Sequence, residues 1–187
     1  MNSRHSKVTD WGLSHTTIHE HNTILDVGCG GGRTVNKLAA RATQGKVYGV
    51  DFSGESVAFA SRINKQWIDT GRVEIREASV SHLPFSENVF DLVTAVETHF
   101  WWPDLPSDMR EVLRVLKPGG ALIIIAEVYK GANTVVAKMA ETYASRTGMT
   151  LLDVVEHRKL FVTAGYSEVQ VIEERNKGWI CAIGGKP

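Results

Sequence analysis

The sequence has few cysteines, no long hydrophobic run and no excess of charge of either sign. Its only cysteines, Cys29 and Cys181, are too few for a disulfide framework. The longest apolar run, 121–126, is far short of the roughly 20 residues that a membrane-spanning helix needs. Lysine and arginine total 21, as do aspartate and glutamate, so no charge excess attracts nucleic acid or an acidic membrane. A small-molecule partner is expected.

The N-terminus also lacks a targeting signal. Residues 1–10 contain no apolar stretch of the kind a signal peptide carries, which predicts a cytoplasmic protein. The chain has 187 residues, 43% of them hydrophobic, enough for one core. No repeat or linker divides it. We therefore expect an N-terminal extension over 1–22 and one domain over 23–187.

From residue 23, short β-branched runs alternate with longer amphipathic stretches in the order β-α-β-α-β-α-β-α-β. The expected strands are 23–27, 46–50, 72–76, 90–95, 121–128, 168–173 and 179–183. The expected helices are 34–42, 55–69, 105–116, 133–147 and 151–163, and Lys117-Pro118-Gly119-Gly120 is expected to form the turn that stops the third of them. The pattern predicts an α/β fold, Rossmann-like and doubly wound, with a mostly parallel seven-stranded sheet and an antiparallel C-terminal hairpin strand.

A glycine-dense turn links the first expected strand to its helix. Gly28, Gly30, Gly31 and Gly32 would let the backbone approach a ligand closely, at the sheet edge where nucleotides bind. Asp51 ends the second strand about 20 residues later, where an acid accepts hydrogen bonds from ribose hydroxyls. On these features alone, both an NAD-dependent oxidoreductase and a nucleoside-binding methyltransferase remain open.

Four motifs that follow one another along the chain help to choose between these two classes of enzyme. They are Leu25-Asp26-Val27-Gly28-Cys29-Gly30-Gly31-Gly32, Val50-Asp51-Phe52-Ser53, Leu83-Pro84-Phe85 with Phe90-Asp91-Leu92-Val93, and Leu116-Lys117-Pro118-Gly119-Gly120. Together they resemble the class I S-adenosylmethionine-dependent methyltransferases, in particular the type 11 group that includes the ubiquinone and menaquinone biosynthesis C-methyltransferases. In addition, the Asp26 carboxylate suits the cationic methionine part of that cofactor better than a pyrophosphate.

The resemblance implies a cofactor site for S-adenosyl-L-methionine and its product S-adenosyl-L-homocysteine. Asp26, Gly28 and Gly30 would line the methionine portion, Asp51 would bind the ribose, and Phe52 would lie beside the adenine. Ser79 stands where the family usually has an aspartate, which predicts weaker adenine binding. The complete expected site is Trp11, Asp26, Gly28, Cys29, Gly30, Arg33, Thr34, Asp51, Phe52, Ser53, Ala78, Ser79, Val80, Val96 and Glu97. Arg33 could instead form a structural ion pair, and Trp11 would cover the site.

The acceptor is expected beside the segment that follows the fourth strand, 95–104. Glu97 or His99 could act as a general base, and Trp101 and Trp102 could wall a substrate pocket. In the alternative interpretation, the aromatic residues anchor the loop and His99 is hydrogen-bonded and inert. No metal site is expected, because His15 and His19 have no carboxylate or cysteine to complete a set.

The acceptor and the oligomeric state stay open. A non-catalytic module that binds S-adenosylmethionine is the principal alternative, and an NAD-dependent oxidoreductase is the less favoured one. The short C-terminal half also leaves a homodimer or a partner chain as an expected contributor to substrate specificity.

Overall fold

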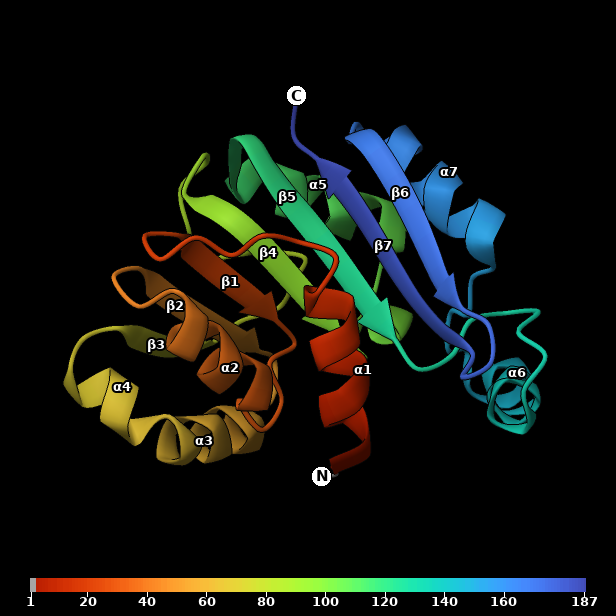
Figure 1. The fold of residues 1–187 in the computed structure, drawn as a ribbon, viewed down its shortest axis with the longest axis horizontal. Coiled ribbons are helices and arrows are strands. Elements are labelled where there is room, and N and C mark those ends of the chain that lie inside the picture. Colours follow the sequence, from red (N-terminus) through yellow and green to blue (C-terminus); the bar gives the residue numbers. More distant parts are fainter. Residues whose placement is uncertain (1–2) are drawn as a thin grey trace.

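Seven strands form one sheet through the middle of the computed structural model, which describes residues 3–187 (Figure 1). The strands are β1 (Thr23–Val27), β2 (Lys46–Asp51), β3 (Val73–Glu77), β4 (Phe90–Val96), β5 (Leu116–Ala126), β6 (Ser167–Glu174) and β7 (Trp179–Gly185). Their order across the sheet is β3-β2-β1-β4-β5-β7-β6. Only β7 runs antiparallel to both of its neighbours, which confirms the predicted fold class.

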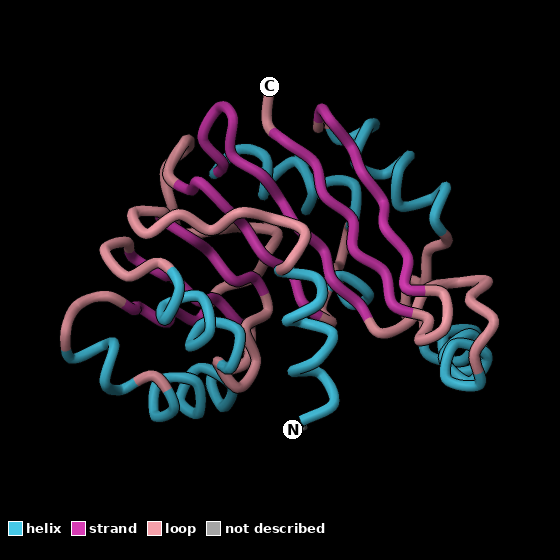
Figure 2. Tube along the Cα trace, in the orientation of Figure 1, coloured by secondary structure: helices cyan, strands magenta, loops and turns pink. Residues whose placement is uncertain are grey.

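Helices cover both faces of the sheet (Figure 2). They are α1 (Ser3–Leu13), α2 (Arg33–Arg41), α3 (Gly54–Ile63), α4 (Lys65–Asp69), α5 (Leu105–Val115), α6 (Val135–Thr147) and α7 (Val154–Ala164), with a 3₁₀ turn, η1 (His99–Trp101). The helices α1 to α4 lie on one face, α5 and α7 lie on the other, and α6 sits beyond the end of the sheet (Figure 1). None of the helices within residues 3–187 is long and apolar enough to cross a membrane.

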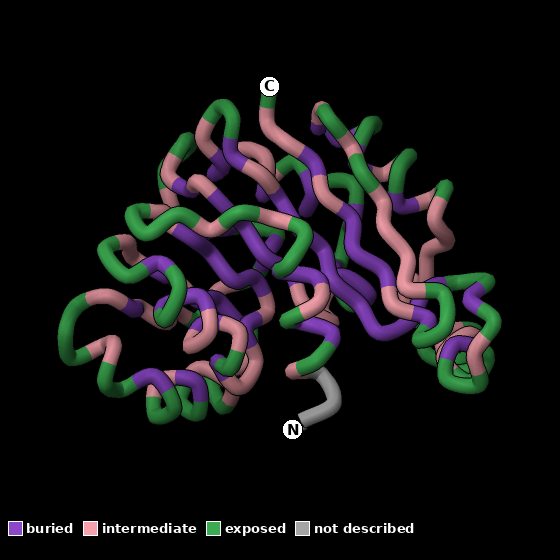
Figure 3. The backbone as a smooth tube through the Cα atoms, in the orientation of Figure 1, coloured by how far each residue is buried: buried purple, intermediate pink, exposed green. Residues whose placement is uncertain are grey.

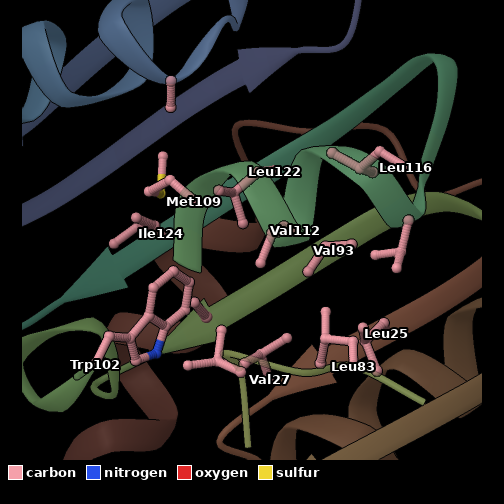
Figure 4. Packing of buried hydrophobic residues seen from close by; sticks show 14 of the residues in the cluster. Leu25, Val27, Leu83, Val93, Trp102, Met109, Val112, Leu116, Leu122 and Ile124 are labelled. Carbon is pink, nitrogen blue, oxygen red and sulfur yellow. The ribbon is translucent and has the colours of Figure 1, made fainter. Parts of the chain in front are cut away.

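The buried residues gather along the central strands of the sheet (Figure 3), and successive side chains of these strands pack on opposite faces. In β1, Ile24 packs toward α1 and α2, whereas Leu25 packs toward α5. On the α5 face, Met109 and Val112 of the helix meet Val93 and Leu122 of the sheet, all of them almost fully buried (Figure 4). Each such side chain stabilises the fold by about 1.5–3 kcal/mol when it is buried.

The sheet reverses its strand order beside β1, and this reversal creates the crevice for a ligand. β1 pairs in parallel with β2 on one side and with β4 on the other. The chain therefore leaves β1 and β4 toward opposite flanks, and their carboxyl ends are separated by an open crevice. The loops that follow β1, β2 and β4 meet there.

Three expectations about local structure are wrong in detail. No helix joins β3 to β4; Pro84 disfavours one, and the backbone of Leu83 and Phe85 bonds instead to side chains of α5. The helix expected over 55–69 ends at Ile63 and restarts at Lys65. The Lys117-Pro118-Gly119-Gly120 turn belongs to β5, where the pairing with β4 is irregular.

The N-terminal extension contains α1, which packs on the sheet. Val8 and Leu13 are buried against a cluster that includes Ile125 and Cys181. A side chain at Gly12 would collide with Ile125, with a closest approach of 2.5 Å, so the glycine allows close contact between helix and strand. The extension therefore shares the core of the domain.

Candidate functional site

A cavity of about 190 Å³ opens at the carboxyl ends of β1, β2 and β4. Six residues that the sequence predicts for the cofactor site line it: Gly28, Asp51, Phe52, Ala78, Ser79 and Val80. Five further residues complete the lining: Val27, Thr98, Trp101, Trp102 and Pro103. The cavity thus joins the predicted adenosine side to the segment predicted to meet the acceptor.

The glycine loop is built so that backbone rather than side chains borders the cavity. Gly28 has a φ of 68°, and a Cβ placed on it would lie 2.0 Å from the Thr98 hydroxyl oxygen. Gly32 also has a positive φ, and a Cβ there would lie 2.5 Å from the amide nitrogen of Asn64. Only glycine fits both requirements at these two positions.

Asn64 holds this loop from outside the cavity. Its side-chain amide is fully buried and donates to the Gly32 carbonyl and to the Ala60 carbonyl, each at 2.9 Å. It also lies where the expected long helix breaks between α3 and α4. Sequence reasoning missed this role; the signal was an asparagine, a poor helix former, in the middle of a helical stretch.

The Asp51 carboxylate is oriented by two backbone donors. Gly30 N–H donates to one oxygen at 2.8 Å, and Ser53 N–H donates to the other at 3.0 Å. A carboxylate has about four acceptor sites, so both oxygens can still accept ribose hydroxyls. Ser53 itself caps α3 through its hydroxyl. Phe52 is 79% exposed at the rim, an unusual position for a phenyl ring without a partner.

Asp26 lies buried at the end of β1, behind the cavity lining. The Thr94 hydroxyl donates to it at 2.6 Å. Burial raises the pKa of Asp26 to about 7, although the Thr94 hydrogen bond opposes the shift. Burial and the two nearby carboxylates of Asp26 and Asp51 also raise the pKa of the Cys29 thiol. Cys29 is therefore a protonated, packed side chain and not a nucleophile.

After β3, residues 78–80 form the expected edge of the cavity. Ala78 N–H donates to the Asp51 carbonyl at 2.9 Å, which ties this segment to the end of β2. Val80 is buried, whereas Ser79 is exposed and its hydroxyl accepts from Ser81 N–H at 3.2 Å. Ser79 thus presents a short polar group where the resemblance expects contact with the adenine.

Glu97 follows β4 in a left-handed conformation, with a φ of 58°. A non-glycine residue adopts this conformation at a cost of about 1–3 kcal/mol, and such residues cluster at functional sites. Its carboxylate accepts from the backbone N–H of Glu127, at the end of β5. Val96, just before it, is half-buried. Glu97 is adjacent to Thr98, which lines the cavity.

His99 does not reach the cavity. It is fully buried, and its Nε2 lies 3.3 Å from Nε2 of the buried His157. His157 Nδ1 lies 2.7 Å from the Asp153 carbonyl, so this nitrogen carries the hydrogen and the other accepts from His99. Burial, and then the charge of His157, hold the pKa of His99 well below its usual value. This matches the alternative in which His99 is inert.

Nine other predicted residues also lie outside the cavity lining: Trp11, Asp26, Cys29, Gly30, Arg33, Thr34, Ser53, Val96 and Glu97. Arg33 and Thr34 begin α2, with Arg33 exposed and Thr34 half-buried. Trp11 packs against Trp179, with ring centroids 5.8 Å apart, at the start of β7. The structure therefore does not bring Trp11 over the site.

The cavity contains one buried donor without a partner. Trp102 is only 7% exposed, and its indole nitrogen has no hydrogen-bond partner. Figure 4 shows this nitrogen on the side of the ring that lies toward Val27, which also lines the cavity. The Gly28 cradle and the oriented Asp51 fit a nucleoside-bearing ligand, and the Trp102 donor fits an oxygen of a molecule bound in the same cavity. Within residues 3–187, no cluster of three or more histidine, cysteine or acidic side chains could hold a metal ion.

Comparisons with known proteins agree with this geometry. Residues 25–124 match the family described as "Methyltransferase domain". Methyltransferase GfsG of Streptomyces halstedii is 38% identical over 109 residues, which cover 58% of this chain and 38% of that protein. Demethylmenaquinone methyltransferase of Lactiplantibacillus plantarum is 34% identical over 123 residues, 65% of this chain and 51% of that protein. This chain thus spans about half or less of the length of these relatives.

Solved structures share the fold across the whole chain. A methyltransferase in complex with the Haloferax volcanii Trm112 methyltransferase activator has a TM-score of 0.83 and 22% identity, covering 98% of this chain and 91% of that one. A SAM-dependent methyltransferase from Aquifex aeolicus has a TM-score of 0.79 and 20% identity, covering 98% of both chains. The chain therefore belongs to the methyltransferase domain family, within the class I fold that uses S-adenosylmethionine, as its motifs predicted.

Proposed function

We propose that this protein transfers the methyl group of S-adenosylmethionine to a small-molecule acceptor that lies against Trp101 and Trp102. One observation carries the proposal: the oriented Asp51, the exposed Phe52 and the two tryptophans all line a single cavity. A cofactor and an acceptor placed side by side would meet beside Gly28 and Thr98, which pack against each other.

The cofactor would be held mainly by Asp51, Phe52 and the glycine loop. Asp51 would accept both ribose hydroxyls, and Phe52 would stack on the adenine and lose its exposure to water. Asp26 would face the positive methionine portion through the glycine loop and ionise in response. When bound, S-adenosylmethionine supplies a methyl group activated by a sulfonium.

The acceptor would be a planar molecule that carries an oxygen. Trp101 is 51% exposed and offers its ring to a flat apolar surface, while the indole N–H of Trp102 would donate to an oxygen of the acceptor. The relatives named as demethylmenaquinone methyltransferases support a quinone-like ring. Positioning two reactants in line can supply about 7–11 kcal/mol of the barrier.

A proton leaves the acceptor if it is a phenol or an activated carbon, and Glu97 is the proposed base. Its left-handed backbone at the end of β4 directs the segment from Thr98 onward into the cavity. His99 has no part in this step, because it is fully buried. The hydrogen bond from Glu127 N–H holds the Glu97 carboxylate in place.

Calorimetric titration tests the cofactor assignment first. We expect wild-type protein to bind S-adenosylmethionine and S-adenosylhomocysteine but not NAD, and Asp51→Ala to lose this binding. Asp69→Ala removes a surface carboxylate that pairs with Lys65 on α4 and is the matched control. Preference for NAD would contradict the proposal.

Transfer is then tested with labelled S-adenosylmethionine and 1,4-naphthohydroquinone as the acceptor. We expect label in the quinol with wild-type protein and much less with Glu97→Gln, although the variant still binds S-adenosylhomocysteine. Binding of the cofactor without transfer to any acceptor in a panel of quinols, phenols and amines would instead favour a non-catalytic module.

A partner subunit is a further part of this proposal. Val135, Met139 and Tyr143 expose apolar side chains along α6, and Tyr143 contacts Trp101 at the mouth of the cavity. One structural neighbour is itself a complex with a methyltransferase activator. Light scattering on the purified chain would distinguish a monomer from a homodimer.

A further inference from the structure

A second, larger groove lies on the other side of the Trp102 wall. Its volume is about 540 Å³, within the usual range for small-molecule sites. One side is the segment that leads into α5, residues 102–106, and the other is α7 together with the linker before it. Trp102 and Pro103 line both this groove and the cofactor cavity. The two sites therefore share one wall.

One face of α7 forms the far side of the groove. Glu156, Lys159, Leu160 and Thr163 all line it, at the spacing of three and four residues that places side chains on a single helix face. Leu105 and Leu152 close the groove from the other elements. Its interior is therefore apolar, and its charged groups lie at the rim.

The charged residues at the rim differ in whether another residue of the chain bonds to them. Glu156 pairs with Lys130 at 2.9 Å and accepts from Asp153 N–H at 2.8 Å. Asp104 accepts from the backbone and the hydroxyl of Ser107. Lys159 is exposed and has no ion pair with any residue of the described chain, 3–187. One cation beside an apolar groove complements an amphipathic anion.

We propose that this groove binds a small amphipathic carboxylate, with its apolar body against Leu105, Leu152 and Leu160 and its carboxylate at Lys159. The bound molecule would press on Trp102 and hold the shared wall in place. Because Trp102 and Pro103 line both sites, binding in the groove would favour the wall position that the cofactor also contacts, and cofactor affinity would rise. This coupling rests on the proposed cofactor site, whereas the binding of a carboxylate in the groove does not.

The test uses octanoate as the ligand and 1-octanol as its uncharged counterpart, both titrated calorimetrically into cofactor-free protein. We expect octanoate to bind about 3-fold more tightly than octanol, the scale of one exposed ion pair. Lys159→Gln should remove this difference and leave octanol binding unchanged. Lys138→Gln alters an exposed lysine on α6, away from the groove, and should change nothing.

A groove-filling variant tests the location independently of charge. Thr163 is exposed on α7, so Thr163→Trp should fold and block both ligands. The proposal is overturned if octanoate fails to bind, if it binds no better than octanol, or if Thr163→Trp binds it normally. Each result is read without cofactor and is therefore independent of methyl transfer.

The coupling is measured as the affinity for S-adenosylhomocysteine with and without saturating octanoate. We expect the affinity to rise about 5-fold, the lower end of typical coupling between two sites. An unchanged affinity would refute the coupling alone. Failure of S-adenosylhomocysteine to bind under either condition would instead contradict the proposed function, and the octanoate titration would still decide whether the groove is a site.

Discussion

The Thr94 hydroxyl donates a hydrogen bond of 2.6 Å to Asp26, across the neighbouring strands β4 and β1. This hydrogen bond favours the ionised form of a carboxylate that burial makes costly to ionise. Because the pKa of Asp26 lies at about 7, the charge of this residue depends on what binds beside it. A cationic ligand would draw the proton off.

Cofactor affinity should therefore depend on pH. If a cation ionises Asp26, S-adenosylmethionine binds about 10-fold more tightly at pH 8 than at pH 6 and releases a proton. Titration calorimetry in buffers of different ionisation enthalpy measures both quantities. Asp26→Asn should give a flat profile, and a wild-type profile equally flat would contradict the role of Asp26.

Stability should show the opposite trend for the same residue. The folded pKa of Asp26 is raised from 3.8, so its contribution to the free energy of unfolding is present below pH 3.8 and is lost as the pH rises to about 7. In the absence of ligand, Asp26→Asn should thus gain stability relative to wild type between pH 5 and pH 8. Urea unfolding at the two pH values measures this difference.

Gly28→Ala should abolish cofactor binding. The new methyl group would lie 2.0 Å from the Thr98 hydroxyl oxygen, in addition to the strain of a positive φ. Gly71→Ala is the matched control, because Gly71 has a similar φ of 74° and no atom within 4 Å of the added carbon. Both variants should lose about 1–2 kcal/mol from the backbone conformation, but only Gly28→Ala should lose binding, by at least about 10-fold.

Asn64→Leu should destabilise the domain and loosen the glycine loop. The substitution removes the side-chain donor of the buried Gly32 carbonyl, which keeps its hydrogen bond from Asn36 N–H, at a cost of about 1 kcal/mol in the free energy of unfolding. The affinity for S-adenosylhomocysteine should fall as well, since Gly30 and Asp51 lie in the same loop system. Asn133→Leu, at an exposed loop position, is the control. Equal unfolding midpoints for the two variants would refute this role.

The buried pair of His99 and His157 should weaken the fold in acid. Burial lowers the pKa of both side chains below 6.5, so their contribution is present above pH 6.5 and is lost as the pH falls below it. His99→Phe should flatten the fall in unfolding free energy between pH 6.5 and pH 5. His21→Gln changes an exposed histidine and should keep the wild-type slope.

Local pattern was enough to predict the strands and most of the helices. β1 and β7 begin where the runs of β-branched and aromatic residues predicted, because each strand alternates side chains between two buried faces. The link from β3 to β4 was predicted wrongly. Its backbone donors and acceptors are satisfied by Glu111 and Arg114 of α5, which are distant in sequence.

The residues of the site fall into the same two groups, those that the local sequence pattern predicted and those that it did not. Gly28, Asp51, Phe52 and residues 78–80 follow strand ends, and parallel strands bring their carboxyl ends together, so motif order alone predicted their meeting. No local sequence pattern marks Thr98 or Pro103 as residues of the cavity. His99 is buried and Trp101 is exposed because their side chains leave the η1 turn in different directions.

The sequence by itself determined the α/β class, the family and the meeting of Gly28, Asp51, Phe52 and residues 78–80 at one cavity, because these depend on periodicity and on glycine and acid positions within single strand–loop units. Only the tertiary structure decided that His99 is buried, that Asn64 holds the glycine loop and that Trp102 separates two cavities. Each of these depends on contacts between residues distant in the chain, and burial and unpaired donors arise only when such segments pack.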